Sequence, residues 1–378
     1  MRIAIINITA GGMSGGYRKY LMSIIPRMVA CPAIKGIMCA APLALQLQSW
    51  FGSLDKIQFV NTKASGFSYF NTHSEMERYL EKFVPDVIFV PVERYFRFNK
   101  VPVVNMVQNM EPFVKNVKGN PLVERVKLKL KYIEGKKAVS RSNRIIAISE
   151  FVMNFLSTRW RIPEEKISLI YHGLDAKPQE EGDRPPIIPE SWTGRFLFTA
   201  GSIRPSRGLE DLVTAMEHIE SLELKGIKLV IAGDGGLTAN PYKNKLLRRV
   251  RQMNLSSNIC WANQLNNLEM TWCYQNCRAF IMTSRVESFG IIAGEAMAHG
   301  CICIAAKNPC LPEIFEDAAI YYPPQDAETL ARAIQIVINW DDSQRIVTSK
   351  KARKRAAFFS WDVCAQKTTA ELVKAAFQ

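Results

Sequence analysis

The sequence predicts an α/β protein made of two doubly wound parallel-sheet domains, and three observations support this. Short apolar runs alternate with helical patterns, which is typical of a parallel sheet covered on both faces. The alternation breaks once, at the proline-rich and acidic residues 174–192 (LDAKPQEEGDRPPIIPESW), and then resumes. A chain of 378 residues is also too long for one ordinary core. We therefore expect a first domain over residues 1–177, a linker over 178–194 and a second domain over 195–360.

The first domain begins with an apolar strand, RIAIINI (2–8), followed by a glycine turn. A helix is expected over 17–29, because apolar residues recur there at about 3.6 positions. Further short apolar runs predict strands at 36–41, 57–61, 86–92, 101–107 and 144–149. Ser149 stands directly before the helical pattern that runs to residue 160, and serine there is typical of a helix N-cap.

The second domain repeats the same alternation. Apolar runs predict strands at 195–201, 227–236, 258–263, 279–284, 302–306 and 319–324. Helical patterns lie between them, at 209–219, 242–253, 268–277 and after Gly290. Ligands of open α/β sheets bind beyond the carboxyl ends of the strands, so we expect a ligand cleft between the two domains.

Composition narrows the compartment and the class of protein. With 48% hydrophobic and 22% charged residues the chain is globular, and no apolar run approaches the roughly 18 residues that span a bilayer. The first residues are too short an apolar stretch for a secretory signal and run straight into glycines. Nine cysteines without a paired framework or metal spacing suit a reducing cytosol. We expect a cytoplasmic protein with no metal site.

The net charge of +14 is unevenly distributed, with one basic segment at 115–144 and a second at 350–355. Nucleic acid, anionic lipid and phosphate-bearing substrates are the partners that such a balance favours. Residues 120–144 mix Leu, Val and Ile with Lys and Arg at helical spacing, which is typical of helices that lie on anionic membranes. We expect segment 115–144 to contact the inner face of the cell membrane, with a merely solvated basic helix as the alternative. No nucleic-acid module accompanies the charge, so no nucleic acid is expected.

A glycine loop follows the first strand, with Gly11, Gly12, Gly15 and Gly16 before the helix. Dinucleotide binding would require Gly-x-Gly-x-x-Gly and an acidic residue about 20 positions further on. The spacing differs, and the next carboxylate after the loop is Asp55. We instead expect the loop to approach a phosphate or a sugar through its backbone amides, a plain tight turn being the alternative.

Two stretches of the second domain predict anion and sugar contacts. Arg204 and Arg207 precede Gly208 at the start of a helix, where guanidinium groups suit a diphosphate; the alternative is a solvated basic loop. In ESFGIIAGEAMAHG (287–300), Gly290 frees the amides of residues 289–292 to face an anion. Glu287 in the loop and Glu295 in the helix would bracket a ligand, because carboxylates accept hydrogen bonds from vicinal hydroxyls. A core salt bridge is the alternative for Glu295.

These motifs carry a family resemblance. ESFGIIAGEAMAHG resembles the Glu-x7-Glu signature of retaining GT-B glycosyltransferases of family 4. ISLIYHGLD (167–175) is similar to the end of that family's first domain, and GSIRPSRGLEDLVTA (201–215) to its donor-phosphate loop. IAGDGG (231–236), residues 308–334 and the stretch 359–377 are similar to later segments of the family. The resemblance covers nearly the whole chain. It implies two Rossmann-like domains facing across a cleft, with the C-terminal helix 361–378 packed back on the first.

The resemblance also implies residue roles. Glu295 would bind the ribose of a nucleotide diphosphate sugar, with UDP or GDP as its nucleotide. Glu287 would contact the transferred sugar, with Ser288, Phe289, Gly290 and Ile291 beside it. Arg207 stands where the family usually has Lys and would neutralise the departing diphosphate. Arg204 would replace a family arginine, because Ser202 occupies that position here.

Three roles fall in the first domain. Gly15 or Gly16 would approach the donor. Gln108 and Asn109 occupy a stretch where many members have His, and neutral amides there would bind hydroxyls or a developing oxyanion. His172 is a candidate for lining the cleft.

The expected reaction is a metal-independent, retaining hexosyl transfer. No Asp-x-Asp motif suited to a metal is visible, so arginines and a helix dipole would stabilise the diphosphate. The acceptor would be a hydroxyl of a glycan or a lipid-linked molecule in polysaccharide or glycolipid synthesis. Two alternatives remain: a nucleotide-sugar epimerase of the same fold, which would need no acceptor, and a non-catalytic nucleotide-sugar binding protein.

Overall fold

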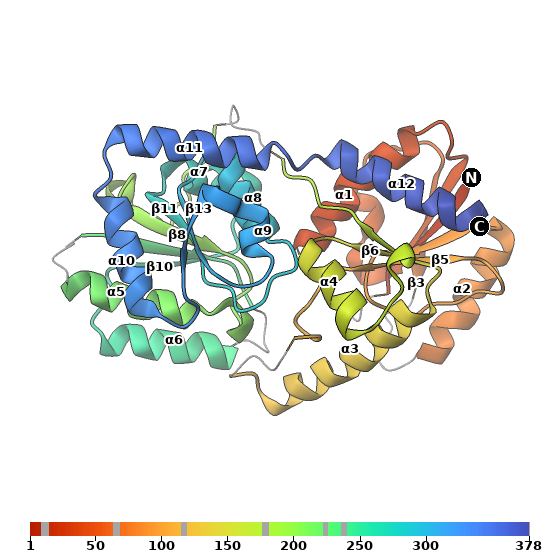
Figure 1. Cartoon of the computed structure of the whole chain (residues 1–378), viewed down its shortest axis with the longest axis horizontal. Helices are drawn as coiled ribbons and strands as arrows, with labels where there is room; N and C mark the ends of the chain where they lie inside the picture. The colour runs from red at the N-terminus through yellow and green to blue at the C-terminus, as the bar shows by residue number, and fades with distance from the viewer. Residues whose placement is uncertain are drawn as a thin grey trace. The chain divides into compact units, whose positions relative to one another are not determined.

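A computed structural model describes residues 1–8, 15–62, 69–114, 119–175, 181–221, 226–235 and 240–377 (Figure 1). The chain divides into two compact units. The first contains residues 1–113, 126–173 and 360–378, and the second contains residues 114–125 and 174–359.

The first unit is built on a seven-stranded parallel sheet in the order β3-β2-β1-β4-β5-β6-β7. Its strands are β1 (Arg2–Ile6), β2 (Gly36–Pro42), β3 (Ile57–Thr62), β4 (Val87–Val90), β5 (Val103–Val107), β6 (Arg144–Ala147) and β7 (Ile167–Leu169). The central strands β4, β5 and β6 are buried along their whole length, as a sheet covered on both faces requires. The predicted parallel sheet is confirmed.

The helices of the first unit are α1 (Gly15–Ala30), α2 (Tyr69–Phe83), α3 (Leu122–Arg141), α4 (Glu150–Arg159) and α12 (Trp361–Phe377). Ser149 caps α4, since its side chain accepts a hydrogen bond from the Val152 N–H at 3.3 Å. That prediction is confirmed. Residues 122–125 of α3 are grouped with the second unit and the rest with the first.

The C-terminal helix α12 packs against α1, as expected (Figure 1). A buried ion pair between Arg144 at the start of β6 and Glu371 fixes it, with side chains 10% and 6% exposed. Arg27 adds an exposed ion pair to Asp362 at 2.6 Å. Residues 360–378, although last in the chain, therefore belong to the first unit.

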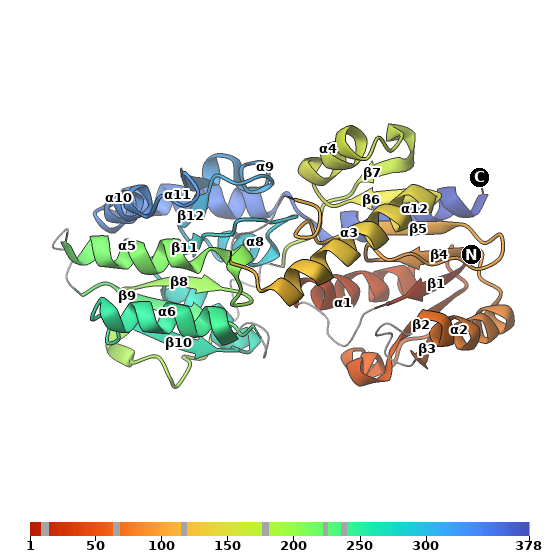
Figure 2. The ribbon, with the colours of Figure 1, turned by 90° about the horizontal axis from the view of Figure 1, so that it is seen from below.

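The second unit contains a six-stranded parallel sheet in the order β10-β9-β8-β11-β12-β13. Its strands are β8 (Phe196–Ala200), β9 (Lys228–Ala232), β10 (Ile259–Asn263), β11 (Ala279–Met282), β12 (Cys303–Ala306) and β13 (Ala319–Tyr322). Its helices are α5 (Leu209–Ser221), α6 (Asn240–Gln252), α7 (Asn267–Asn276), α8 (Ile291–Ala298), α9 (Leu311–Phe315), α10 (Ala327–Ile338) and α11 (Asp342–Ala356). Figure 2 shows α5 and α6 running alongside the strands of this sheet.

The stretch that was expected to be a linker, residues 178–194, is in its described part packed into the second unit. The chain passes between the units at residues 173 and 174, and residues 181–194 lie in the second unit. Ile188 is fully buried, and the Asp183 N–H donates to the Leu268 carbonyl at 3.2 Å. Prolines limit regular structure here to the short 3-10 helix Glu190–Trp192, yet the backbone still bonds to α7. Residues 178–180 of the expected linker lie outside the described part of the chain.

None of the described helices is long and apolar enough to cross a membrane. The second basic segment, 350–355, lies in α11, and several of its side chains bind groups of the second unit. Arg355 donates to the carbonyls of Glu313 and Ile314 at 2.7 and 2.8 Å, and Lys351 pairs with Asp317 at 3.0 Å. These bonds hold α11 against the α9 region.

Candidate functional site

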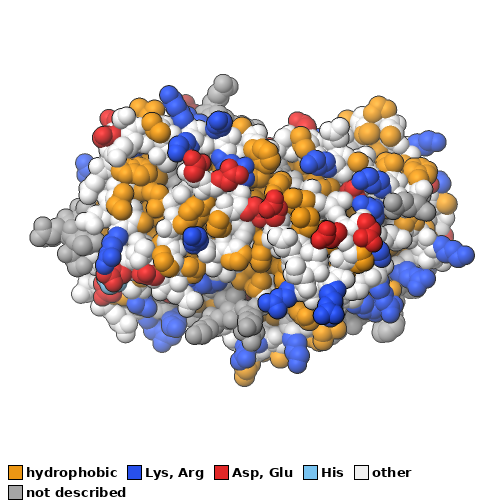
Figure 3. Space-filling model, in the orientation of Figure 1, with side chains coloured by type: hydrophobic (Ala, Val, Ile, Leu, Met, Phe, Trp, Pro, Cys, Tyr) orange, Lys and Arg blue, Asp and Glu red, His pale blue; other side chains and the backbone are white. Residues whose placement is uncertain are grey.

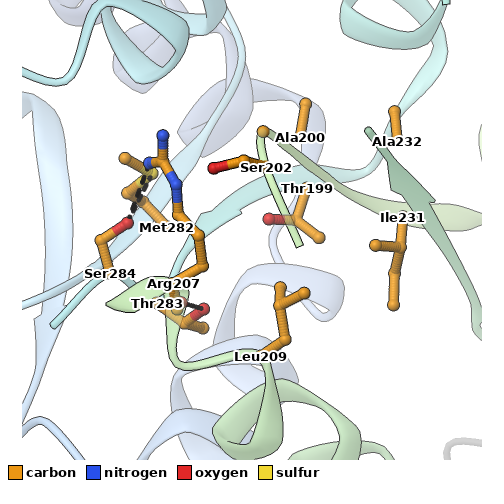
Figure 4. A pocket seen from close by; sticks show the side chains of 11 residues that line it. Thr199, Ala200, Ser202, Arg207, Leu209, Ile231, Ala232, Met282, Thr283 and Ser284 are labelled. Carbon is orange, nitrogen blue, oxygen red and sulfur yellow. Dashed lines mark hydrogen bonds between the residues drawn. The ribbon is translucent and has the colours of Figure 1, made fainter. Parts of the chain in front are cut away.

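A pocket opens in the second unit at the carboxyl ends of β8, β9 and β11 (Figure 4). Arg207 reaches into this pocket from the turn between β8 and α5. The lining residues are Thr199, Ala200, Gly201, Ser202, Arg207, Leu209, Ile231, Ala232, Met282, Thr283 and Ser284. This is the edge of a doubly wound sheet where ligands bind.

The structure brings Arg207 and Glu287 together. The Arg207 guanidinium donates to a Glu287 carboxylate oxygen and, at 3.1 Å, to the Ser284 hydroxyl. The side chains are 22% and 13% exposed, so this ion pair is mostly shielded from water. Figure 4 shows the Arg207 side chain extending between Ser284 and Ser202. An arginine fork that already holds one oxyanion can also hold a phosphate.

The loop that carries Glu287 ends in a tight turn before α8. Gly290 is the N-cap of α8 with φ of 86°, a left-handed conformation that favours glycine. The first amides of a helix have no partner within it, so those of Ile291 and Ile292 are suited to an anion. Phe289 is 2% exposed and packs edge-on against Phe359, and Ser288 is 7% exposed. Any ligand contact at Phe289 would therefore use its backbone, because its ring belongs to the core.

Glu295 lies within α8, as predicted, and has a partner in a neighbouring helix. The Tyr274 hydroxyl donates to a Glu295 carboxylate oxygen at 3.3 Å and to the Ile292 carbonyl at 3.2 Å. Burial and the nearby Glu295 charge hold the pKa of Tyr274 well above its usual range, so the phenol remains a donor at neutral pH. Glu295 is half-buried, and the phenol is a neutral hydrogen-bond donor to it.

The remaining donor-loop arginine is placed differently. Arg204 is partly buried and precedes the short turn Pro205–Arg207, whose first hydrogen bond runs from the Arg207 N–H to the Arg204 carbonyl at 2.9 Å. Arg204 is not among the pocket-lining side chains, whereas Arg207 is.

In the first unit, Gln108 and Asn109 follow β5. The Gln108 side-chain amide donates to the Pro91 carbonyl at 3.0 Å, and its backbone N–H donates to the Glu93 carboxylate at 3.2 Å. Asn109 is exposed, and its side-chain oxygen accepts from the Glu111 N–H at 2.9 Å. Burial raises the pKa of Glu93, although the amides of Glu93, Gln108 and Asn109 oppose this. The sequence analysis did not identify Glu93.

Gly15 and Gly16 form the first residues of α1. Gly11 and Gly12, the other glycines of the predicted loop, lie outside the described residues. The structure therefore places only the helical end of that loop.

The expectation for His172 is wrong. Its side chain is buried inside the first unit, with ring centroids 5.0 Å from Tyr20 and 5.8 Å from Trp361. Burial lowers the pKa of His172 to about 3, so the imidazole is neutral at physiological pH. It is part of an aromatic core beside α12, because the final helix closes over it.

Cysteines and acidic residues offer no obvious metal site in the described chain. The described part of the chain contains no group of three His, Cys, Asp or Glu side chains that could hold a metal ion. All nine cysteines are free thiols, most of them buried.

Comparisons with known proteins agree with this architecture. The family model described as "Glycosyl transferases group 1" matches residues 185–355, and that described as "Glycosyltransferase Family 4" matches residues 42–177. The chain belongs to glycosyltransferase family 4. Its two Rossmann-like units have the GT-B fold class, and the resemblance inferred from the sequence is confirmed.

Relatives of this family 4 chain are distant. It is 26% identical over 244 residues to the uncharacterized glycosyltransferase MJ1607 of Methanocaldococcus jannaschii, covering 60% of this chain and 59% of that one. It is 21% identical to the O-antigen chain mannosyltransferase RfbU of Salmonella typhimurium, covering 55% and 54%. The chain thus spans little more than half the length of these curated relatives. Among solved structures, HepE of Anabaena in complex with UDP-glucose has a TM-score of 0.75 at 15% identity, covering 99% of both chains.

Proposed function

We propose that this protein is a retaining glycosyltransferase that uses a nucleotide diphosphate sugar as donor. The observation that carries the proposal is the convergence of Arg207, Ser284 and Glu287 at the carboxyl edge of the second sheet. The guanidinium suits a diphosphate and the carboxylate suits sugar hydroxyls. Family membership and the UDP-glucose named for the fold neighbour HepE support a UDP- or GDP-sugar as donor.

The proposed reaction places positive charge where negative charge grows. The bond between the anomeric carbon and the phosphate oxygen breaks, and its electron pair leaves with the diphosphate. Arg207 and the first amides of α8 stabilise that charge. The acceptor hydroxyl oxygen forms the new bond on the same face of the sugar, and its proton passes to the departing phosphate. Configuration is thereby retained without an enzymic nucleophile and without a metal in this scheme.

The acceptor is proposed to be a hydroxyl of a glycan or a lipid-linked molecule in polysaccharide or glycolipid synthesis. The similarity to an O-antigen mannosyltransferase supports this class of acceptor. On the first unit, Gln108 and Asn109 are the proposed contacts for hydroxyls, because Asn109 is exposed at the carboxyl end of β5.

Turnover decides between transfer and the alternatives. Thermal-shift screening against UDP-, GDP- and ADP-sugars identifies the donor, and nuclear magnetic resonance of the product reads the anomeric configuration. We expect transfer only with an acceptor present, and at least about tenfold loss in Arg207→Ala but none in Arg332→Ala, an exposed arginine of the same unit. Conversion of donor without any acceptor would favour an epimerase. Binding without any turnover would favour a non-catalytic binding protein, and an inverted product would refute retention.

We also propose that α3 lies on an anionic membrane, at the cytoplasmic face. From Val123 onward its large apolar residues recur three or four positions apart, and with the adjacent Leu122 they are solvent-exposed: Leu122 (74%), Val123 (67%), Val126 (60%), Leu130 (44%) and Ile133 (57%). Residues at this spacing share one face of a helix. Exposed Arg125, Lys127, Lys129 and Lys136 accompany them, and Figure 3 shows basic and hydrophobic side chains together over α3 at the lower edge of the view.

An apolar stripe bordered by basic residues complements anionic lipid, each basic residue contributing about 1 kcal/mol near the surface. The C-terminal part of the helix packs on the first unit through Gly135, Ala138 and Val139, which are buried, whereas the apolar stripe is exposed to solvent. Membrane contact would bring the enzyme to a lipid-linked acceptor.

Sedimentation with vesicles tests this placement. Binding to phosphatidylglycerol vesicles but not to phosphatidylcholine vesicles is expected, with about tenfold weaker binding for Leu130→Glu/Ile133→Glu. Ile336→Glu on α10, which also replaces an exposed isoleucine, is the control and should bind like the wild type. Equal binding to both kinds of vesicle, or to neither, would refute the role of α3. Concentration-dependent dimers that the double variant abolishes would instead assign the stripe to a second copy.

A further inference from the structure

Two segments of the second unit, residues 206–211 and 283–287, are joined by a pair of reciprocal ion pairs. Each segment contributes one arginine, and Glu210 of the first segment adds a longer contact to Arg285 at 3.4 Å. Arg207 of the first segment pairs with Glu287 of the second, and Arg285 of the second pairs with Asp211 of the first. One of these ion pairs lies at the pocket, while the other involves no pocket-lining residue.

The ion pair between Arg285 and Asp211 is bidentate and deeply buried. Its two N–H···O distances are 2.5 and 2.6 Å, and the side chains are 13% and 6% exposed. The Asp211 carboxylate also accepts from the Gln325 N–H at 3.0 Å and from the Tyr322 hydroxyl at 3.3 Å. Such a geometry restrains both planar groups, because each makes several directional bonds.

Backbone contacts hold the same two segments in register. The Arg285 N–H donates to the Ser206 carbonyl at 2.8 Å, and the Thr283 hydroxyl donates to the Arg207 carbonyl at 2.6 Å. Gly208 lies between them with φ of 61°, and a Cβ there would stand 2.5 Å from the Thr283 carbonyl oxygen. The segments therefore approach more closely than a side chain at residue 208 would allow.

We propose that Arg285 and Asp211 are positioning residues that fix Arg207 relative to Glu287. The inference rests on the proposed function, in which Arg207 binds a diphosphate. That phosphate would take the place of the Glu287 carboxylate on the guanidinium. When the ion pair between Arg207 and Glu287 (the outer pair) opens, the ion pair between Arg285 and Asp211 (the inner pair) remains. It and the backbone contacts still hold the two segments together. Arg285 is neutralised by Asp211 and therefore stays out of competition for the phosphate. Neither residue touches the donor; they act through Arg207 and Glu287.

The test compares Arg285→Lys and Asp211→Asn with Arg332→Lys, which alters an exposed arginine of the same unit. Asp211→Asn keeps the size of the side chain and Arg285→Lys keeps its charge, while each removes the bidentate pair. At a temperature well below the melting point of every variant, we expect kcat to fall at least about tenfold in the inner variants. The affinity for UDP or GDP, measured by calorimetry, should change less than about threefold. Arg332→Lys should match the wild type.

Chemical rescue separates positioning from mere stabilisation. In Arg285→Ala, added guanidinium at millimolar concentration should restore kcat in a saturable way, because it can occupy the space beside Asp211. Wild-type kcat in a folded Arg285→Lys or Asp211→Asn would overturn the proposal, as would an equal loss of kcat and of nucleotide affinity. Failure of the wild type itself to bind or turn over any donor is a different result, since it refutes the proposed function. Should Arg285→Lys not fold, the comparison rests on Asp211→Asn.

Discussion

Replacing Glu287 by glutamine should make the protein bind free UDP or GDP more tightly while it turns over donor more slowly. The Glu287 carboxylate is paired with the guanidinium that the diphosphate needs. The glutamine keeps the shape of the side chain but removes the competing negative charge. Product affinity and turnover should then change in opposite directions, which ordinary loss of a contact does not produce.

The magnitude follows from the burial of the ion pair. With exposures of 22% and 13%, an effective dielectric constant of about 20 applies, and charges about 4 Å apart attract by roughly 4 kcal/mol. A phosphate that replaces the carboxylate recovers most of that attraction. The remaining cost is repulsion between phosphate and displaced carboxylate, roughly 2 kcal/mol at about 8 Å before screening. We expect a gain of about 1–2 kcal/mol, or about 5- to 30-fold tighter nucleotide binding.

Calorimetric titration with UDP and GDP measures the affinity, and release of nucleotide from the donor in the presence of acceptor measures the turnover. Turnover should fall at least about tenfold, because the carboxylate no longer contacts the sugar. Glu328→Gln, in the exposed ion pair with Arg332, should change neither quantity. Unchanged or weaker nucleotide binding in Glu287→Gln would show that Glu287 does not compete with the diphosphate, and the reasoning would fail.

Three further outcomes are expected. Arg207→Lys should retain part of the activity lost in Arg207→Ala, because the charge remains while the fork is lost; equal kinetics of the two in a donor assay would exclude charge as the relevant property. The pKa of His172 is about 3 in the folded protein and about 6.5 in the unfolded chain, so only the unfolded chain binds a proton between these pH values. The free energy of unfolding should therefore fall as the pH is lowered from 6.5 toward 3, by about 2 kcal/mol at pH 5. Calorimetry of His172→Phe should show a shallower acid dependence than the wild type, and an equal slope would contradict the assignment. Glu371→Ala should destabilise the first unit by about 3–5 kcal/mol, because it leaves Arg144 buried without its partner, and limited proteolysis should then release α12; resistance like that of the wild type would count against this.

Much of the fold could be predicted because its signals are local. A parallel strand buried on both faces reads as a short apolar run, which identified most strands of both sheets, including β8 and β11. The three-residue edge strand β7 was too short to be predicted as a strand. The Ser149 cap was equally visible, since it depends on residues within one turn. Glu287 and Arg207 could be identified for the same reason: charged side chains beside glycines at strand ends carry a local signal. That they form an ion pair across 80 positions could not be read from the sequence.

The contacts missed by sequence reasoning are all long-range. Tyr274 lies in the middle of a helical pattern, and nothing nearby indicates that its hydroxyl meets Glu295. Arg285 and Asp211 are ordinary charged residues until the fold places them opposite each other. For His172 the error came from assigning a role by motif context, whereas α12 covers the ring from the other end of the chain. Burial of this kind depends on tertiary packing that no local pattern encodes.

Because α12 belongs to the first unit, the two units can complete their folding at different times during synthesis. The second unit draws most of its residues from the continuous stretch 174–359, so it can fold as soon as that stretch has left the ribosome. The first unit, although made earlier, waits for residues 360–378, and until Glu371 arrives Arg144 has no buried counter-charge. The nascent chain thus carries an unfinished first unit until residues 360–378 have been made.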